Sequence, residues 1–182
     1  MKIAVVGRGN VGGGLADLWE RAGHSVTRIG KEGGDVSDAD AVLIAVPGGA
    51  IADALDKVQG LEGKTAIDAT NLFGAPRPDG FDSNAQFVKS RTNGPTAKSF
   101  NVNFANLYQQ VGSARTRPSN VWSGDEEARD VVEQLIRDAG YDPLYAGGLE
   151  NARAQEDVLA LIGAIRQNLG PFFYRMAPPE AL

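Results

Sequence analysis

Three glycines near the amino terminus, Gly7, Gly9 and Gly12, have the G-x-G-x-x-G spacing of a phosphate-binding turn. They follow a short apolar run at residues 3–6 and open a helix-like segment at residues 11–22. In this context Gly7 permits a tight turn from strand to helix, Gly9 lets the backbone approach a pyrophosphate, and Gly12 lets the helix pack on the strand. The free N–H groups at the start of the helix then face the phosphate charge. The residues of this predicted dinucleotide-binding loop are Gly7, Arg8, Gly9, Asn10, Val11 and Gly12.

The residues after the second predicted strand, at 25–29, select between the two common dinucleotides. NAD-binding proteins usually end this strand with an acidic residue that accepts hydrogen bonds from the ribose hydroxyls. Here Gly30 and Lys31 follow the strand, and they leave space and positive charge for the additional phosphate of NADP. Arg8 can reach the same side of the adenosine, and its guanidinium pairs with phosphate oxygens in a way that lysine cannot. We therefore expect NADP, with Glu32 as a ribose ligand for NAD as the alternative.

Further candidate contacts lie where the predicted strands end, because open parallel sheets bind ligands beyond the carboxyl ends of their strands. These candidates are Val46 and Pro47 after the third strand, Asn71 after the fourth and Asn101 after the fifth. The Asn amides can hydrogen-bond a nicotinamide amide, a ribose hydroxyl or a second substrate. Alternatively, each Asn only forms a turn, because Asn tolerates left-handed backbone. Asp68, the one acid near a strand end, is expected to anchor the turn that follows it.

The predicted strand ends carry no histidine, no Lys-Tyr pair and no cluster of carboxylates. A dehydrogenase that acts on an alcohol must move a proton as well as a hydride, so it needs a positioned acid or base. Hydride transfer between two stacked cofactor rings depends on their orientation instead. We therefore expect ring-to-ring hydride transfer in which no side chain is a catalytic residue.

Apolar runs that alternate with helical patterns must position these residues. Strands are predicted at 3–6, 25–29, 41–46, 65–69, 97–100, 120–123 and 141–146, and helices at 11–22, 50–58, 83–91, 125–139 and 150–169. Asp125 is the expected N-cap of its helix, and the connection 31–40 is too short for a crossover helix. The order predicts an α/β, Rossmann-type fold with a doubly wound, mostly parallel sheet and a small C-terminal helical part that closes the cleft. We expect one compact domain, with residues 1–101 as the dinucleotide-binding half and residues 102–182 as the half that completes the sheet and covers the cleft.

Composition narrows the classes of partner. The 182 residues can bury one sizeable core, and a net charge of −5 without a basic cluster argues against nucleic acid. The chain has no cysteine, and the one histidine, His24, stands in a turn, so no metal site is expected. No apolar run reaches the length of a membrane span, and the first predicted strand begins where a signal peptide would stand. We expect a soluble, cytoplasmic protein whose partners are small-molecule redox cofactors.

Several motifs together resemble the family of NADPH-dependent reductases of the deazaflavin coenzyme F-420, the F-420H2:NADP oxidoreductases, which share their architecture with the reductase domain of six-transmembrane metalloreductases. The resembling segments are Gly7-Arg-Gly-Asn-Val-Gly12, Ala45-Val-Pro47, Lys98-Ser-Phe-Asn101, Trp122-Ser-Gly-Asp125 and Gly147-Gly-Leu-Glu-Asn-Ala-Arg153 with Glu156. The resemblance implies that NADP(H) binds along the strand ends and that coenzyme F-420 is the second substrate. The family's Ser-Arg pair for the adenosine phosphate aligns with Gly30-Lys31, which keeps the cation and lacks the hydroxyl. A reductase of another acceptor (a flavin, a quinone or an imine) and a non-catalytic NADP-binding sensor remain as alternatives.

The predicted C-terminal helix at 150–169 carries apolar residues at helical spacing, namely Val158, Leu159, Leu161, Ile162, Ile165 and Leu169. We expect this face to cover the sheet. The alternative is that part of it closes the cleft or forms the seam of a homodimer. Arg153 and Glu156 lie three residues apart and can pair on the helix surface. The aromatic residues 172–174 form either a buried plug or an interface.

The Lys31→Ala variant tests the choice of dinucleotide. Loss of a charge-assisted contact should weaken NADP binding by about 1–3 kcal/mol and leave NAD binding nearly unchanged. Dissociation constants for both dinucleotides, measured at one ionic strength, check this expectation. Equal losses for the two dinucleotides, or no loss for either, would show that Lys31 does not contact the phosphate.

Overall fold

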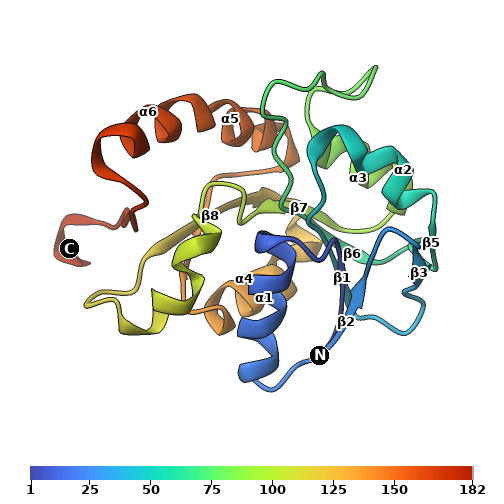
Figure 1. Cartoon of the computed structure of the whole chain (residues 1–182), viewed down its shortest axis with the longest axis horizontal. Coiled ribbons are helices and arrows are strands. Elements are labelled where there is room, and N and C mark those ends of the chain that lie inside the picture. Colours follow the sequence, from blue (N-terminus) through green and yellow to red (C-terminus); the bar gives the residue numbers. More distant parts are fainter. Residues whose placement is uncertain (182) are drawn as a thin grey trace.

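The computed structural model describes residues 1–181 and has a seven-stranded sheet with the order β2-β1-β4-β6-β7-β8-β9 (Figure 1). The strands are β1 Lys2–Val6, β2 Ser25–Ile29, β4 Ala41–Ile44, β6 Thr65–Asp68, β7 Thr96–Ser99, β8 Ser119–Gly124 and β9 Asp142–Tyr145. All neighbouring pairs are parallel except β7 with β8. The short strands β3 Gly34–Asp35 and β5 Val58–Gln59 form a second, parallel pair. This topology confirms the predicted Rossmann-type α/β fold.

Helices cover both faces of the sheet. The α-helices are α1 Asn10–Arg21, α2 Ile51–Leu55, α3 Asn84–Thr92, α4 Arg129–Asp138, α5 Ala152–Asp157 and α6 Leu159–Leu169. The 3-10 helices are η1 Gly48–Ala50, η2 Ala105–Ser113, η3 Glu126–Ala128, η4 Leu149–Asn151 and η5 Pro179–Ala181. One hydrophobic cluster joins α1, η2 and α4 to one face, and a second joins α2 and α3 to the other. The two clusters share the buried, β-branched strands between them, as parallel sheets require.

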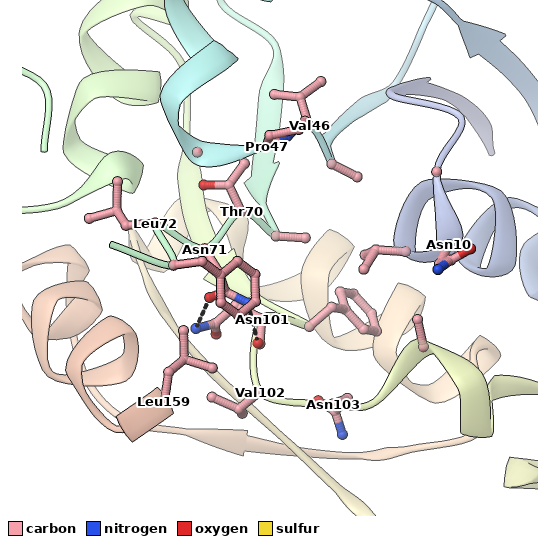
Figure 2. A pocket seen from close by; sticks show the side chains of 18 of the residues that line it. Asn10, Val46, Pro47, Thr70, Asn71, Leu72, Asn101, Val102, Asn103 and Leu159 are labelled. Atoms are coloured by element: carbon pink, nitrogen blue, oxygen red, sulfur yellow. Dashed lines mark hydrogen bonds between the residues drawn. The ribbon is translucent and has the colours of Figure 1, made fainter. Parts of the chain in front are cut away.

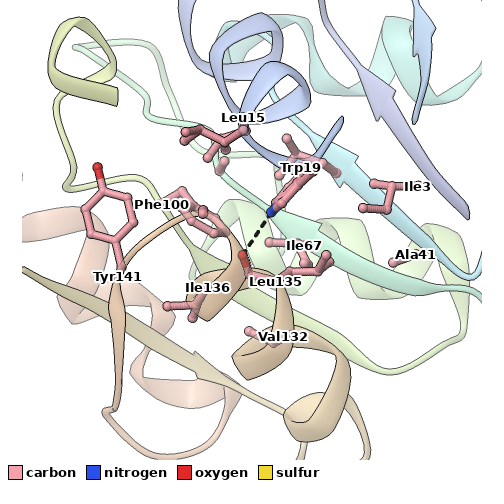
Figure 3. Packing of buried hydrophobic residues seen from close by; sticks show 14 of the residues in the cluster. Ile3, Leu15, Trp19, Ala41, Ile67, Phe100, Val132, Leu135, Ile136 and Tyr141 are labelled. Carbon is pink, nitrogen blue, oxygen red and sulfur yellow. Dashed lines mark hydrogen bonds between the residues drawn. The ribbon is translucent and has the colours of Figure 1, made fainter. Parts of the chain in front are cut away.

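The larger cluster fixes the orientation of α1, whose N-terminus forms the predicted phosphate-binding turn (Figure 3). Trp19 of α1 is fully buried, and its ring packs edge-on against Phe100, with centroids 5.8 Å apart. The Trp19 indole N–H donates to the backbone oxygen of Leu135 on α4 at 2.9 Å. The polar atom of this large side chain therefore has a partner, which keeps its burial favourable.

One predicted strand boundary and one predicted helix cap are wrong. The third strand ends at Ile44 rather than at 46. Asp125 does not cap its helix with its side chain; its carboxylate accepts from the Thr96 backbone N–H at 2.7 Å and from Lys89 Nζ at 2.5 Å. The Asp125 carboxylate thus binds the N–H at the start of the buried strand β7 instead of an N–H of the helix. A buried N–H without a partner costs more free energy than an exposed one at a helix end.

The predicted single helix at 150–169 is wrong as well, because the chain forms η4, α5 and α6 in succession. Helix α5 buries Ala152, Gln155 and Glu156, whereas α6 has no buried residue. The two helices therefore pack differently, the first against the sheet and the second beyond it (Figure 1). The expected pair of Arg153 with Glu156 is absent from the described contacts, since Arg153 Nε donates to Asp157 at 2.6 Å and Glu156 turns inward.

A buried ion cluster holds α5 on the sheet. Lys98 of β7 is fully buried, and its Nζ donates to Asp68 Oδ2 at 2.8 Å, Glu156 Oε1 at 3.0 Å and the Thr70 backbone oxygen at 2.7 Å. These contacts use the three N–H donors of the ammonium group. Because the partners come from the end of β6, from the turn after it and from α5, one side chain fixes three segments together.

The Lys98→Met variant should lower the free energy of unfolding by about 3–5 kcal/mol, because buried Asp68 loses its counter-charge and buried Glu156 keeps only Arg77, 3.8 Å away. Urea denaturation measures this loss. Lys89→Met is the matched control, since Lys89 forms a partly exposed pair with Asp125 and should cost about 1 kcal/mol or less. Adding Asp68→Asn and Glu156→Gln to Lys98→Met should restore part of the loss. An unchanged urea midpoint in Lys98→Met would contradict the assigned role of the cluster.

Candidate functional site

The glycine turn after β1 has the geometry of a phosphate cradle. Gly7 has φ of +110°, and a Cβ there would lie 2.3 Å from the Ala45 backbone oxygen. A Cβ on Gly12 would lie 2.0 Å from the Gly7 backbone oxygen. These two positions therefore exclude side chains for reasons internal to the protein. Gly9 differs, because a Cβ on it would have no described protein atom within 4 Å. The space over Gly9 is thus free for a ligand.

The N-terminus of α1 offers hydrogen-bond donors to that space. Its N-cap is Gly9, which has no side chain to accept from the first turn, and this fully described first turn contains no acidic residue. The N–H groups at the start of a helix lack intrahelical partners, and the helix dipole adds partial positive charge. The turn can therefore bind an anionic group such as a pyrophosphate.

A cleft of about 1010 Å³ continues from this turn along the carboxyl ends of β1, β4, β6 and β7. The predicted site residues that line it are Gly9, Asn10, Val11, Val46, Pro47, Asn71 and Asn101. Figure 2 shows Asn10 on one side of the cleft and Leu72 and Leu159 on the other, with Asn71 and Asn101 between them. Gly7, Gly12 and the adenosine-side candidates Arg8, Gly30 and Lys31 lie outside the cleft lining.

The two strand-end asparagines bind each other. Asn71 Nδ2 donates to the Asn101 backbone oxygen at 2.7 Å, and Asn101 Nδ2 donates to Asn71 Oδ1 at 3.2 Å (Figure 2). The amide of Asn101 also donates to the Gln155 backbone at 3.0 Å and accepts from Gln155 Nε2 at 2.8 Å. The Asn101 side chain is therefore satisfied by the protein, whereas Asn71 keeps a second amide N–H for a ligand. Their direct contact with a cofactor stays a prediction.

Arg8 and Glu32 form an exposed ion pair outside the cleft lining. The two side chains meet over Gly30, where a Cβ would lie 2.5 Å from Glu32 Oε2 and 2.7 Å from Arg8 Cζ. Glu32 thus reaches back to the strand end at which Gly30 stands. Its pKa lies below the usual range because its own backbone N–H donates to it and because Arg8 is near. Lys31 is exposed beside this pair.

Helix α6 forms a wall of the cleft. Leu159, Ile162, Gly163 and Arg166 line it, so the expectation that this face covers the sheet is wrong and the alternative that it closes the cleft is confirmed. One face of the sheet is already covered by α1, η2 and α4, so α6 has no place on that face. Other apolar side chains of α6, such as Leu161 and Leu169, are exposed. A homodimer through them stays a prediction.

The aromatic segment after α6 packs inward as a plug. Phe172 lies edge-on to Phe104, with centroids 5.1 Å apart, and Phe173 packs against the main core. The Tyr174 hydroxyl accepts from the Val121 N–H at 3.3 Å and donates to Asn103 Oδ1 at 3.5 Å. Burial raises the pKa of Tyr174 to about 12, so the hydroxyl stays neutral at physiological pH.

Sequence reasoning gave no role to several residues that shape the site. Gln155 donates to the Val121 backbone at 2.9 Å and accepts from Ser123 Oγ at 3.1 Å, so α5 is attached to β8 as well as to β7. The available signal was the spacing of Ala152, Gln155 and Glu156, which places all three on one face of a helix. Polar residues on an inward-facing stripe indicate a buried polar network when partners of matching chemistry, such as Lys98, stand on the strands.

No protein-family model matches the chain, and no curated protein matches it. Among solved structures it is similar to a candidate F-420-dependent NADP reductase from an Arthrobacter species, with a TM-score of 0.81 and 24% identity over 98% of this chain and 100% of that one. A hypothetical protein from Sinorhizobium meliloti has a TM-score of 0.70 and 22% identity over 97% and 94% of the two chains. A reductive aminase from Aspergillus terreus in complex with NADPH has a TM-score of 0.67 and 16% identity over 93% of this chain and 62% of that one. At these identities the similarities establish a shared fold.

Two structural features are absent from residues 1–181. The helices in this range are too short or too polar for any of them to cross a membrane. The same residues contain no group of three or more His, Cys, Asp or Glu side chains that could hold a metal ion.

The Gly9→Val variant tests the phosphate cradle. Its side chain would enter the open space over the turn, so dinucleotide binding should be lost while the fold persists, since no protein atom lies there. Titration followed by NADPH fluorescence measures binding, and circular dichroism checks the fold. Gly112→Val is the control, because its Cβ also meets no described atom, its φ is outside the left-handed region and the residue lies outside the cleft lining. Unchanged dinucleotide affinity in a folded Gly9→Val protein would show that this turn does not bind the pyrophosphate.

Proposed function

We propose that this protein is an NADP-dependent oxidoreductase that transfers a hydride between NADP(H) and a flavin-like ring, with the deazaflavin coenzyme F-420 as the second substrate. The observation that carries the proposal is one continuous cleft, which begins at the open glycine turn and ends at α6. Such a cleft has room for a dinucleotide at the strand ends and a second ring beside it. The similarity to a candidate F-420-dependent NADP reductase over the full length supports the choice of acceptor.

The glycine turn fits the dinucleotide. The backbone at Gly9, Asn10 and Val11 would hold the pyrophosphate, because the turn presents free N–H groups to a space without protein atoms. Arg8 and Lys31 would bind the additional phosphate of NADP. Arg8 must exchange its ion pair with Glu32 for that phosphate, and Glu32 thereby lowers the selectivity over NAD.

The residues of the cleft would orient two rings. NADP(H) supplies the hydride chemistry when it is bound. Val46 and Pro47 offer rigid, apolar backbone at the end of β4, and Asn71 offers an uncommitted amide N–H. Apart from Arg166, the described lining side chains are apolar, hydroxyl or amide groups. This composition supports a reaction that depends on ring geometry and on exclusion of water.

The two halves of the chain would divide this work. We propose that residues 1–101 hold the dinucleotide and that residues 102–182 complete the sheet and provide the wall for the acceptor. In support, the glycine turn and β4 belong to the first half, and Leu159 and Ile162 of the cleft wall belong to the second. Imine reduction is the second candidate function, because a reductive aminase and an imine reductase share the fold at TM-scores of 0.67 and 0.66.

Stereospecifically deuterated NADPH tests the proposed reaction. Offered coenzyme F-420, FMN, riboflavin, a quinone and a cyclic imine, the protein should transfer the label directly to the deazaflavin ring, because the two rings stack without an intervening proton donor. Mass spectrometry of the product measures the transfer. The His24→Ala variant should leave the rate of hydride transfer nearly unchanged, because His24 pairs with Asp138 outside the cleft.

Three outcomes would contradict the proposal. With coenzyme F-420 as acceptor, loss of the label to water in a single turnover would exclude ring-to-ring transfer, because the deazaflavin accepts the hydride on carbon and a C–D bond does not exchange. Turnover of the imine alone would favour the second candidate. Tight NADPH binding without turnover of any acceptor would indicate a sensor.

A further inference from the structure

Arg166 is the one charged side chain among the described residues that line the cleft. It stands in the last turn of α6 and is solvent-accessible. Leu159, Ile162 and Arg166 lie three and four residues apart, so they follow one another along one face of the helix. The apolar wall of the cleft therefore continues into a single positive charge.

The guanidinium of Arg166 lies over an aromatic ring. Its Cζ lies 5.9 Å from the centroid of the Phe104 ring, which itself packs against Phe172. Among residues 1–181 no carboxylate pairs with it, whereas Arg153 and Arg77 both pair with Asp157 on the neighbouring helix. An arginine that rests on an aromatic face keeps its N–H donors free for an oxyanion.

The surroundings of Arg166 suit a flat, apolar ring next to the anion. Leu159 and Ile162 come from α6, and Val102 and Phe104 come from the segment after β7; all four line the cleft. These side chains offer no charge to a ring placed among them. A substrate that uses both features has a planar ring and a side chain that ends in a phosphate or a carboxylate.

We propose that Arg166 binds an oxyanion, a phosphate or a carboxylate, on the side chain of the second substrate, whose ring lies against α6. This inference rests on the proposed function, because it assumes that the dinucleotide occupies the glycine-turn end of the same cleft. It adds the chemical class of the acceptor and the residue that selects it. A neutral acceptor with the same ring gains nothing from Arg166.

FMN and riboflavin form a matched pair of probes, because they share ring and ribityl chain and only FMN has a phosphate. Flavin fluorescence polarisation with the protein saturated with NADP⁺ measures both dissociation constants. Arg166→Gln should raise the constant for FMN about tenfold and leave that for riboflavin unchanged. Arg166→Lys should give an intermediate loss for FMN, because it keeps the charge without the planar fork. A flavin with a carboxymethyl side chain distinguishes a carboxylate from a phosphate as the preferred anion.

Arg137→Gln is the control for net charge, because Arg137 lies on α4 and pairs with Glu133 outside the cleft lining. It should leave both flavin constants unchanged. Equal losses for FMN and riboflavin in Arg166→Gln would overturn the inference, as would weaker NADP⁺ binding in that variant or no flavin binding to the wild type. A separate titration of NADP⁺ alone isolates the proposed function, and its failure would overturn both.

Discussion

The site depends on one buried cation, the ammonium group of Lys98. Removal of this group from water is costly, and its burial is favourable only because Asp68, Glu156 and the Thr70 backbone surround it at 2.7–3.0 Å. The three partners come from different parts of the chain, so these segments must lie close together to surround the ammonium group. Helix α5 must lie on β7 for Glu156 to accept from the Lys98 ammonium group, and α6 follows α5 directly and forms a wall of the cleft.

A layer of neutral hydrogen bonds extends this cluster to the surface of the cleft. Gln155, beside Glu156 in sequence, contacts Asn101, and Asn101 in turn contacts Asn71. Each amide orients the next because amide donors and acceptors are directional. The floor of the cleft therefore consists of amides that orient one another, and Asn71 keeps one N–H of its amide for a ligand.

The electrostatics of the cleft differ from those of the whole chain. The protein has a net charge of −5, yet the described cleft lining contains no acidic side chain. Positive potential enters at two separate points, from the backbone N–H groups at the start of α1 and from Arg166 on α6. Anionic ligands are favoured at both ends of such a cleft, while the excess negative charge elsewhere disfavours polyanions such as nucleic acid.

The sequence by itself determined the features that depend on short-range physics. The spacing of Gly7, Gly9 and Gly12 predicted the turn, because the positive φ of Gly7 and the close approach of Gly12 to the Gly7 carbonyl are local requirements, and apolar runs predicted the parallel strands. Only the tertiary structure decided that Asp125 binds β7, that Glu156 turns to Lys98 and that the C-terminal helix divides near Val158. In the first two cases a partner 29 or more residues away competes with a local one, and burial makes the distant contact the stronger of the two. Periodicity reports which residues share a face, but the charge or surface that the face meets comes from the fold.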